Sequence, residues 1–414
     1  MRILVVQESD WVERGPHQNH HLMERLSERG HTIKVIDFEI AWREKRSDAL
    51  MSKRIVLEGV RKASRGEVTV IRPAFARLPL LDYVSLIFSH RKEISKQIAE
   101  FKPDVIVGFG ILNTAIAISL ARKAGIPIVY YIIDELFRLV RERTFQPMAK
   151  IIETYNMRRA DRVVSINDAL REYTIRMGAD RDSALTIRAG VDKSAFNLSD
   201  SETKAMRRSL GANDEDILML FMGWLYVFSG VKEVADELNS SNQFPNIKLL
   251  ILGKGDLWGY LESATKEHAG EKRIILVGWK SFKEVPKYIL ASDVCLLPAL
   301  QTDIMMNIVP IKMYEYLAAG KPVIATRLPG LLREFGQGNG VVYVNDPRDV
   351  LEAVAKLARE GSARDLGAKA RRFVEGNDWQ KVVTDFEDCL EGVITCQRNS
   401  GNNRWTAEEP QNPV

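Results

Sequence analysis

The chain has 414 residues, of which 45% are hydrophobic and 28% are charged, an ordinary balance for a soluble globular protein. This length exceeds what one hydrophobic core usually supports, so two domains are expected. No apolar run reaches the roughly 18–20 residues that a membrane-spanning helix needs. The N-terminus lacks the apolar stretch and cleavage site of a signal peptide. Three scattered cysteines suit neither a disulfide framework nor a zinc site, so a cytoplasmic protein is predicted.

The net charge of +4 hides an asymmetry between the two halves of the chain. Residues 1–200 hold 33 Lys and Arg against 26 Asp and Glu, whereas the remainder holds 26 against 29. A basic half attracts anionic phosphates or a membrane surface. The alternative is a solvated basic surface that has no partner. Peripheral membrane contact through the N-terminal half therefore stays a hypothesis, and no nucleic-acid partner is expected.

The first half of the chain alternates short apolar strands with helices. Apolar runs without alternation, separated by helices, indicate buried parallel strands in βαβ units. This half therefore predicts a doubly wound, Rossmann-like domain. Strands are expected at residues 3–6, 32–36, 105–107, 128–132 and 163–166, and helices at residues 20–29 and 114–123.

Residues 71–92 mix aromatic and aliphatic side chains with flanking basic residues. Such a segment suits a membrane interface or a lipid-linked acceptor. The competing interpretation is a connector that leads to a buried core helix. The sequence leaves both open.

The second half repeats the alternation and predicts a second Rossmann-like domain. Its strands are expected at residues 217–221, 247–252, 274–277, 294–297 and 323–325, and its helices at residues 231–238 and 285–290.

The domain boundary is expected near the polar stretch that follows residue 190. We place the domains at residues 1–195 and 196–375. Residues 376–397 then form an amphipathic helix. The polar residues 398–414, rich in Asn, Gly, Pro, Gln and Glu, are expected to be disordered.

Residues 307–326 are the most informative segment for function. A turn leads into a helix that carries Glu315, and the helix ends at Gly320, with Pro322 and a buried strand after it. A helix N-terminus concentrates unpaired N–H groups where an anion such as a diphosphate binds. Glu315 would then accept hydrogen bonds from sugar hydroxyls.

This segment resembles the nucleotide-sugar site of retaining glycosyltransferases of the GT-B fold, in glycosyltransferase family four (the group 1 type). That family's motif has two glutamates separated by seven residues, followed by an E-A-x-A-x-G-x-P-V-I run. Here the second glutamate is Glu315, and the first position is Asn307. The resemblance extends over roughly residues 1–395. Gly190-Val191-Asp192 with Phe196 matches the family's hinge signature.

The resemblance implies an α/β protein of the GT-B fold, with two facing Rossmann-like domains and a C-terminal helix that crosses back to the first. It implies an enzyme that moves a sugar, with retention, from a nucleotide-diphosphate sugar to a glycan, lipid-linked or small-molecule acceptor. The donor is a co-substrate, so no cofactor is expected. No metal is expected either, and the six histidines contain no H-E-x-x-H spacing.

The resemblance also shows where this chain departs from the family. Its Phe221–Val231 region aligns with a G-R-L-x-x-x-K-G-V run whose Arg and Lys bind the donor diphosphate. After Gly223, this chain has Trp224 and Ser229 at those two positions. A hydrogen bond to a charged group contributes roughly 1.5–3 kcal/mol, so another cation is needed. Lys312, one turn before Glu315, is the expected replacement, and Lys232, expected on the outer face of its helix, is a weaker candidate. The alternative is that Lys312 only pairs with Glu315 or faces solvent.

Further donor contacts are implied by the resemblance. The amides of Ile308 and Val309, with Asn307, would face the sugar and the diphosphate. Gly253 lies at a strand end. Gly15 opens the loop Gly15-Pro16-His17-Gln18-Asn19-His20, which matches the family's G-G-x-x-x-H loop, although an ordinary βα turn is the alternative.

The acceptor side is defined by fewer residues. Residues 108–110 read Gly-Phe-Gly where many relatives have a histidine, and backbone N–H groups there can lie near a ligand. Asp134 and Glu135 follow the strand 128–132, and one of them orients an acceptor hydroxyl; the alternative for Asp134 is a helix cap. The catalytic candidates are therefore Glu315, Asn307 and Asp134.

Two other functions stay open on the same fold. One is a nucleotide-sugar epimerase or hydrolase. The other is a non-catalytic binding subunit that has lost the Arg/Lys pair.

Overall fold

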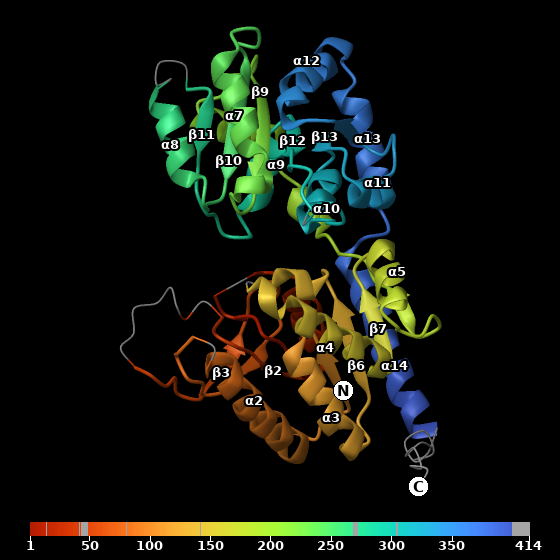
Figure 1. The fold of residues 1–414 in the computed structure, drawn as a ribbon. Helices are drawn as coiled ribbons and strands as arrows, with labels where there is room; N and C mark the ends of the chain where they lie inside the picture. Colours follow the sequence, from red (N-terminus) through yellow and green to blue (C-terminus); the bar gives the residue numbers. More distant parts are fainter. Residues whose placement is uncertain are drawn as a thin grey trace. The chain divides into compact units, whose positions relative to one another are not determined.

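The computed structural model describes residues 1–13, 15–40, 42, 49–79, 81–140, 142–267, 272–303 and 305–399 (Figure 1). The chain divides into two compact units. One comprises Met1–Arg188 with the segment from Gln380 onward, and the other is Ala189–Trp379. The expected boundary at residue 195 therefore falls inside the second unit. Of the expected tail, residues 398 and 399 belong to the last helix, and residues 400–414 lie outside the described residues.

The first unit is built on a sheet of eight strands in the order β3-β4-β2-β1-β5-β6-β7-β8, and among these only β3 runs antiparallel to its neighbour. The strands are β1 (Arg2–Val6), β2 (Thr32–Ile36), β3 (Ile55–Val60), β4 (Val68–Arg72), β5 (Val105–Gly108), β6 (Ile128–Ile132), β7 (Arg162–Ser165) and β8 (Ala184–Thr186). The helices are α1 (Gln18–Glu28), α2 (Leu81–Glu100), α3 (Leu112–Ala124), α4 (Gln146–Arg159), α5 (Asp168–Arg176) and α14 (Trp379–Asn399), with the 3-10 turns η2 (Leu136–Leu139) and η3 (Arg143–Phe145).

The centre of this sheet is buried, as its uninterrupted aliphatic runs predict. Strands β1, β5 and β6 have buried residues at nearly every position. Strands β3, β4 and β8 were not predicted, and in β3 the residues Ile55, Val56 and Leu57 are solvent-exposed. Residues 71–92 contain the end of β4, a connector and the first part of α2, whose inner face is buried through Leu86 and Ile94.

The last helix, α14, returns to the first unit. The ring of Phe386 lies 5.6 Å from that of Tyr131 on β6. Glu387 pairs with Arg29, after α1, at 2.5 Å. The predicted return of the C-terminal helix is therefore confirmed.

The second unit has a six-stranded parallel sheet in the order β11-β10-β9-β12-β13-β14. The strands are β9 (Ile217–Met222), β10 (Ile247–Leu252), β11 (Ile274–Leu276), β12 (Val294–Leu297), β13 (Val323–Thr326) and β14 (Val341–Val344). The helices are α6 (Asp200–Ser209), α7 (Val231–Ser240), α8 (Trp258–Glu267), α9 (Val285–Ala291), α10 (Ile311–Ala318), α11 (Pro329–Phe335), α12 (Val350–Glu360) and α13 (Ala363–Phe373), with the 3-10 turns η4 (Lys193–Phe196), η5 (Val227–Ser229) and η6 (Pro347–Asp349). Two Rossmann-like sheets are thus present, as the alternation predicted.

The two connections between the units run side by side. The Val191 N–H donates to the carbonyl of Asn377 at 2.8 Å, and Val191 forms a parallel bridge with Asp378. A Cβ at Gly190 would lie 2.4 Å from the Trp379 ring. Glycine is therefore needed at position 190 for close packing against the second connection.

Candidate functional site

The end of β9 and the start of α10 meet at one point in the second unit. The Lys312 ammonium donates to the carbonyl of Met222 at 2.9 Å and lies 4.6 Å from the centroid of the Phe221 ring. One turn further along α10, the hydroxyl of the buried Tyr316 accepts a hydrogen bond from the Met222 N–H at 3.1 Å. Side chains of α10 therefore bond both the N–H and the carbonyl of Met222. These two bonds fix the first turn of α10 at the carboxyl end of the sheet.

Lys312 and Glu315 are half-buried on this helix, and each shifts the pKa of the other. Burial lowers the pKa of Lys312 to about 8, and the Glu315 carboxylate partly opposes that shift. Burial likewise raises the pKa of Glu315 to about 7, with the Lys312 ammonium acting in the other direction. Among the described residues, the Glu315 carboxylate has no hydrogen-bond partner. A desolvated carboxylate and ammonium on one helix form a polar site that a ligand could complete.

Two glycines, at the ends of β9 and β10, allow close packing near Lys312. Gly223 has a φ of +125°, and a Cβ there would lie 3.3 Å from the Lys312 ammonium. Gly253, after β10, has a φ of +148°, and a Cβ would lie 1.9 Å from the carbonyl oxygen of Gly223. Gly253 therefore lets two strand ends approach each other, which is a structural reason for glycine at this position.

The loop before α10 is held by α11. The Arg333 guanidinium donates to the Asn307 side-chain oxygen at 2.5 Å. The Gly330 N–H donates to the carbonyl of Met306 at 2.8 Å. The Ile308 N–H donates to the carbonyl of Met305 at 3.3 Å, so this amide is already bonded within the loop.

The backbone N–H groups nearest the start of α10 make fewer hydrogen bonds. In the described ranges, the N–H groups of Val309, Ile311 and Lys312 have no acceptor. Of the two loop amides expected to face a ligand, Val309 is therefore the one left available.

The two positions where the family has cations differ in exposure. Ser229 in η5 is buried, and its hydroxyl makes no hydrogen bond within the part of the chain that the structure describes. Trp224 is 47% exposed. Its ring centroid lies 5.6 Å from that of Trp279 and 5.9 Å from that of Tyr226. These three exposed rings, which we call the aromatic group, lie in loops after β9 and β11.

Sequence reasoning missed Trp279 and Tyr226. The signal for Trp279 was its place directly after a parallel strand, where open α/β sheets bind ligands. Tyr226 had a weaker signal, because it belongs to a loop that was interpreted only through the family's cations.

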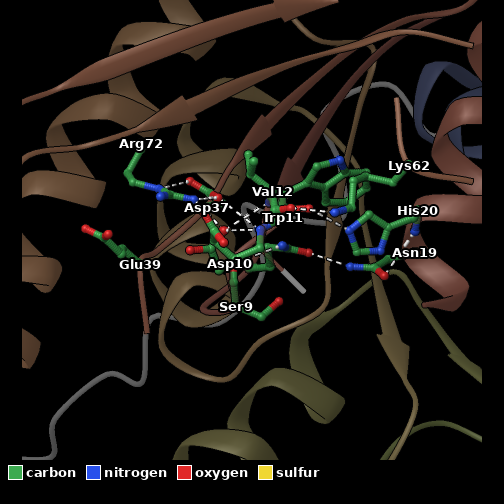
Figure 2. A network of polar contacts seen from close by, with 12 residues as sticks. Ser9, Asp10, Trp11, Val12, Asn19, His20, Asp37, Glu39, Lys62 and Arg72 are labelled. Atoms are coloured by element: carbon green, nitrogen blue, oxygen red, sulfur yellow. Dashed lines mark hydrogen bonds and ion pairs between the residues drawn. The ribbon is translucent and has the colours of Figure 1, made fainter. Parts of the chain in front are cut away.

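In the first unit, a buried ionic network holds the loop between β1 and α1 (Figure 2). Arg72, at the end of β4, donates to Asp37 and Asp10 at 2.6 and 2.7 Å. Asp37 also accepts from the N–H of Trp11 at 3.0 Å. Asp10 accepts from the N–H of Val12 at 2.9 Å. Charged residues at the ends of β2 and β4 therefore fix the start of this loop.

The same loop depends on a neutral histidine. His20 is buried, and its Nδ1 accepts from the N–H of His17 at 3.1 Å. Nε2 must then carry the proton that it shares with the carbonyl of Trp11 at 3.0 Å. Burial lowers the pKa of His20 to about 3. A Cβ at Gly15, whose φ is +91°, would lie 2.7 Å from the His20 ring, so both residues have a structural role in shaping this loop.

Asp134 follows β6, and the expectation that it caps a helix is wrong. Turn η2 begins at Leu136, with Glu135 in the cap position and no side-chain capping bond. The amides of Leu136 and Phe137 donate instead to Glu153 of α4, at 3.2 and 3.3 Å.

The carboxyl group of Asp134 is left available for another role. It is half-buried and has no hydrogen-bond partner among the described residues. Burial, followed by the neighbouring Glu135, raises its pKa to about 7. A carboxyl group with that pKa at a strand end can accept or hold a proton near neutrality.

Of the backbone amides at residues 108–110, that of Phe109 donates to the carbonyl of Val6 at 2.9 Å, and Glu8 binds the amides that follow them. The Glu8 carboxylate accepts hydrogen bonds from the N–H of Ile111, at 2.9 Å, and from that of Asn113. A Cβ at Gly110 would lie 2.8 Å from the same carboxylate. The start of α3 is thus occupied by a side chain of the protein itself.

The two units hold different parts of the expected site. Gly15 and Asp134 belong to the first unit, and the remaining residues belong to the second. Across the described ranges, no group of His, Cys, Asp and Glu has the geometry of a metal site.

The two halves of the chain match known protein families. Residues 202–373 match the family described as Glycosyl transferases group 1, and residues 17–190 match the Glycosyl transferase 4-like domain. An uncharacterized glycosyltransferase of Methanocaldococcus jannaschii, MJ1607, is 25% identical over 230 residues, which are 54% of this chain and 58% of that relative. The chain therefore spans little more than half the length of this curated relative.

Solved structures resemble nearly the whole chain. Sucrose-phosphate synthase from Thermosynechococcus elongatus aligns with a TM-score of 0.72 at 17% identity, covering 95% of this chain and 99% of the other. HepE of Anabaena, in complex with UDP-glucose, aligns with a TM-score of 0.70 at 16% identity, covering 95% and 100%. At these identities the likeness shows the fold alone. Together with the two parallel sheets, it confirms the predicted GT-B fold.

Proposed function

Because this chain belongs to the glycosyltransferases of the GT-B fold, we propose that it transfers a sugar from a nucleotide-diphosphate sugar to an acceptor hydroxyl, with retention. The observation that carries the proposal is the position of Lys312, 2.9 Å from the carbonyl at the end of β9 and one turn from Glu315. A solved relative in fold, HepE, is in complex with UDP-glucose, which supports a nucleotide-sugar as the class of donor.

In this proposal Lys312 supplies the positive charge for the diphosphate. The family's two cations are absent at Trp224 and Ser229, and Ser229 is buried. An ammonium that is half-desolvated in the free protein gains more from a phosphate partner than an exposed one does. The Val309 N–H and the first turn of α10 add hydrogen-bond donors at the same point.

Glu315 binds a hydroxyl group of the donor ribose in this proposal. Its carboxylate is desolvated and has no hydrogen-bond partner in the described part of the chain, so two hydroxyl donors can satisfy it. The aromatic group then covers a ring of the donor. Asn307, which Arg333 holds at 2.5 Å, is fixed in the loop where the sugar enters.

The chemistry needs no protein nucleophile. The bond between the anomeric carbon and the diphosphate oxygen breaks, and a bond from that carbon to the acceptor oxygen forms on the same face. The acceptor proton passes to the departing diphosphate. Lys312 and the helix amides stabilise the charge that develops there. Asp134 is the proposed residue that orients an acceptor hydroxyl from the first unit.

The first experiment measures release of nucleoside diphosphate from UDP-, ADP- and GDP-glucose, with and without sugar, glycan and lipid-linked acceptors. A glycosyltransferase releases it slowly to water and faster when an acceptor is present, with one new glycoside for each diphosphate. Equal release without acceptor would favour a hydrolase, and conversion of the sugar without release would favour an epimerase. Binding without turnover of any donor would favour a non-catalytic subunit.

A further inference from the structure

Three neighbouring helices of the first unit present an unusual outer surface. Helix α3 packs between α2 and α4 in one layer (Figure 1). Each of the three connects two parallel strands of the same sheet, so all three run in the same direction, against the strands. Their first turns therefore lie beside the carboxyl ends of the strands, and their last turns lie beside the amino ends.

The outer faces of α2 and α4 share one residue pattern. Large apolar residues occur at i, i+3 and i+7, and basic residues follow at i+10 and i+11. These spacings place all five side chains of each helix on one stripe. The stripes are Leu81, Val84, Phe88, Arg91 and Lys92 on α2, and Met148, Ile151, Tyr155, Arg158 and Arg159 on α4.

These apolar side chains face solvent. Phe88 is 70% exposed and Ile151 is 71% exposed. Single exposed apolar residues are common, but a set aligned along two helices of one layer marks an interaction surface. Helix α3, between them, carries small or uncharged residues on the same register and ends in Arg122 and Lys123.

The charge of this layer is one-sided. The three helices contain eight basic and four acidic residues. Asp82, Glu93 and Glu153 are buried, which leaves Glu100 as the one exposed acid on these helices. The helix dipole favours the basic residues in the last turns of α3 and α4, but it does not account for Arg91 and Lys92, which lie before the last turn of α2. The dipole gives no reason for Phe88 and Ile151 to be exposed.

An apolar strip beside a basic strip matches the surface of an anionic lipid bilayer, where acyl chains lie beneath charged headgroups. We propose that the outer faces of α2 and α4, with α3 between them, dock this protein on an anionic membrane. The apolar part of each stripe inserts at the headgroup boundary, and the basic residues that follow it on the same stripe contact lipid phosphates. In the described ranges no helix is long and apolar enough to cross a membrane, so docking is peripheral.

The test is co-sedimentation of the full chain with vesicles of phosphatidylcholine alone, and of phosphatidylcholine mixed with phosphatidylglycerol. Wild type should bind the mixed vesicles, and added salt should weaken binding. Phe88→Asp with Ile151→Asp should reduce binding by about tenfold or more for each side chain. Both side chains are mostly exposed, so the thermal unfolding of the variant should stay close to that of wild type.

A matched control changes net charge equally on the other unit. Lys356→Ala with Arg364→Ala, on exposed positions of α12 and α13, removes two positive charges from the second unit. This control should bind the mixed vesicles as wild type does. The proposal would be overturned if both double variants lost vesicle binding equally. It would also be overturned if wild type bound phosphatidylcholine vesicles as well as it binds the mixed vesicles.

A second copy of the chain is the other occupant of this surface that the test can detect. If wild type ignores all vesicles and Phe88→Asp with Ile151→Asp converts a dimer to a monomer in sedimentation velocity, the surface joins two copies of the chain instead. Nucleotide binding by the same variants, measured by calorimetry, should be unchanged, because the docking surface does not depend on the donor site.

Discussion

The Lys312 ammonium lies 2.9 Å from the carbonyl oxygen of Met222, at the point where β9 ends. In the family that this chain resembles, cations reach the diphosphate from the loop after the corresponding strand. Here that loop holds Trp224 and the buried Ser229. A cation from α10 therefore lies at the same strand end as the missing pair. We interpret this as relocation of the diphosphate cation from the loop to the helix.

Glu315 should destabilise the fold in a pH-dependent way. Its pKa rises from 4.5 to about 7 on folding, so the folded state binds more protons than the unfolded state between those values. The stability of wild type therefore falls as pH rises through that window. Glu315→Gln removes this titration, so its stability relative to wild type should improve by roughly 1–3 kcal/mol between about pH 5 and about pH 8.

Thermal unfolding of both proteins at the two pH values measures this difference. Donor turnover by Glu315→Gln should fall by roughly 10- to 100-fold, as expected for loss of a hydrogen bond to a charged group. Parallel stability curves for the two proteins would show that this carboxyl group does not titrate as described.

The aromatic group should contribute to donor binding. Trp224→Ala removes a half-exposed ring that lies 5.6 Å from Trp279. Loss of a stacking contact should weaken nucleotide-sugar binding by about 1–3 kcal/mol. Tyr260→Ala removes an exposed ring on α8 and serves as the control. Quenching of tryptophan fluorescence by nucleotide measures both affinities, and equal affinities would exclude a contact with Trp224.

Asp134 should influence the acceptor step alone. Measured in the Glu315→Gln background, where the titration of Glu315 near pH 7 is absent, Asp134→Asn should remove an inflection near pH 7 from the turnover profile, because burial raises the pKa of this carboxyl group to about 7. Nucleotide affinity should be unchanged. Glu135→Gln, whose wild-type carboxylate pairs with Arg138 at 2.5 Å, is the matched control and should keep the inflection. An inflection that survives in Asp134→Asn would assign it to another group.

Arg72 should be essential for the stability of the first unit. Arg72→Met leaves the carboxylates of Asp10 and Asp37 buried without their guanidinium. Removing one partner of a buried ion pair costs about 3–5 kcal/mol. Thermal unfolding should show this loss, and adding Asp10→Asn and Asp37→Asn should recover part of it. A fully stable single variant would contradict the described network.

The sequence was sufficient for most of the parallel strands that bury continuous aliphatic runs. The strands at residues 32–36, 128–132, 247–252 and 294–297 were predicted with the bounds that the structure has. Strands β3, β4, β8 and β14 were missed, and of these β3 is exposed at Ile55, Val56 and Leu57. The same exposure hides the outer face of α2, whose apolar residues are indistinguishable in sequence from core residues.

Tertiary contacts account for the remaining differences at the site. Helix-cap patterns suggested a cap at Asp134, but Glu153 of a later helix binds those amides. Glu8 occupies the start of α3 in the same way. The aromatic group is assembled from separate loops, so no local motif contains it. The pairing of Lys312 with Glu315, by contrast, follows from helical spacing within one segment.

The central claim is that Lys312 binds the donor diphosphate, and calorimetric titration of UDP, ADP and GDP tests it most directly. Lys321→Met is the matched control, because Lys321 also donates to a backbone carbonyl, that of Leu290 at 2.8 Å, but lies beyond the opposite end of α10. For the nucleotide that binds wild type best, Lys312→Met should weaken affinity by about tenfold or more, while Lys321→Met should not. Wild-type affinity should also fall as pH rises past about 8, where Lys312 loses its proton, and Lys312→Met should lack that fall. Wild-type affinity in Lys312→Met would contradict the account.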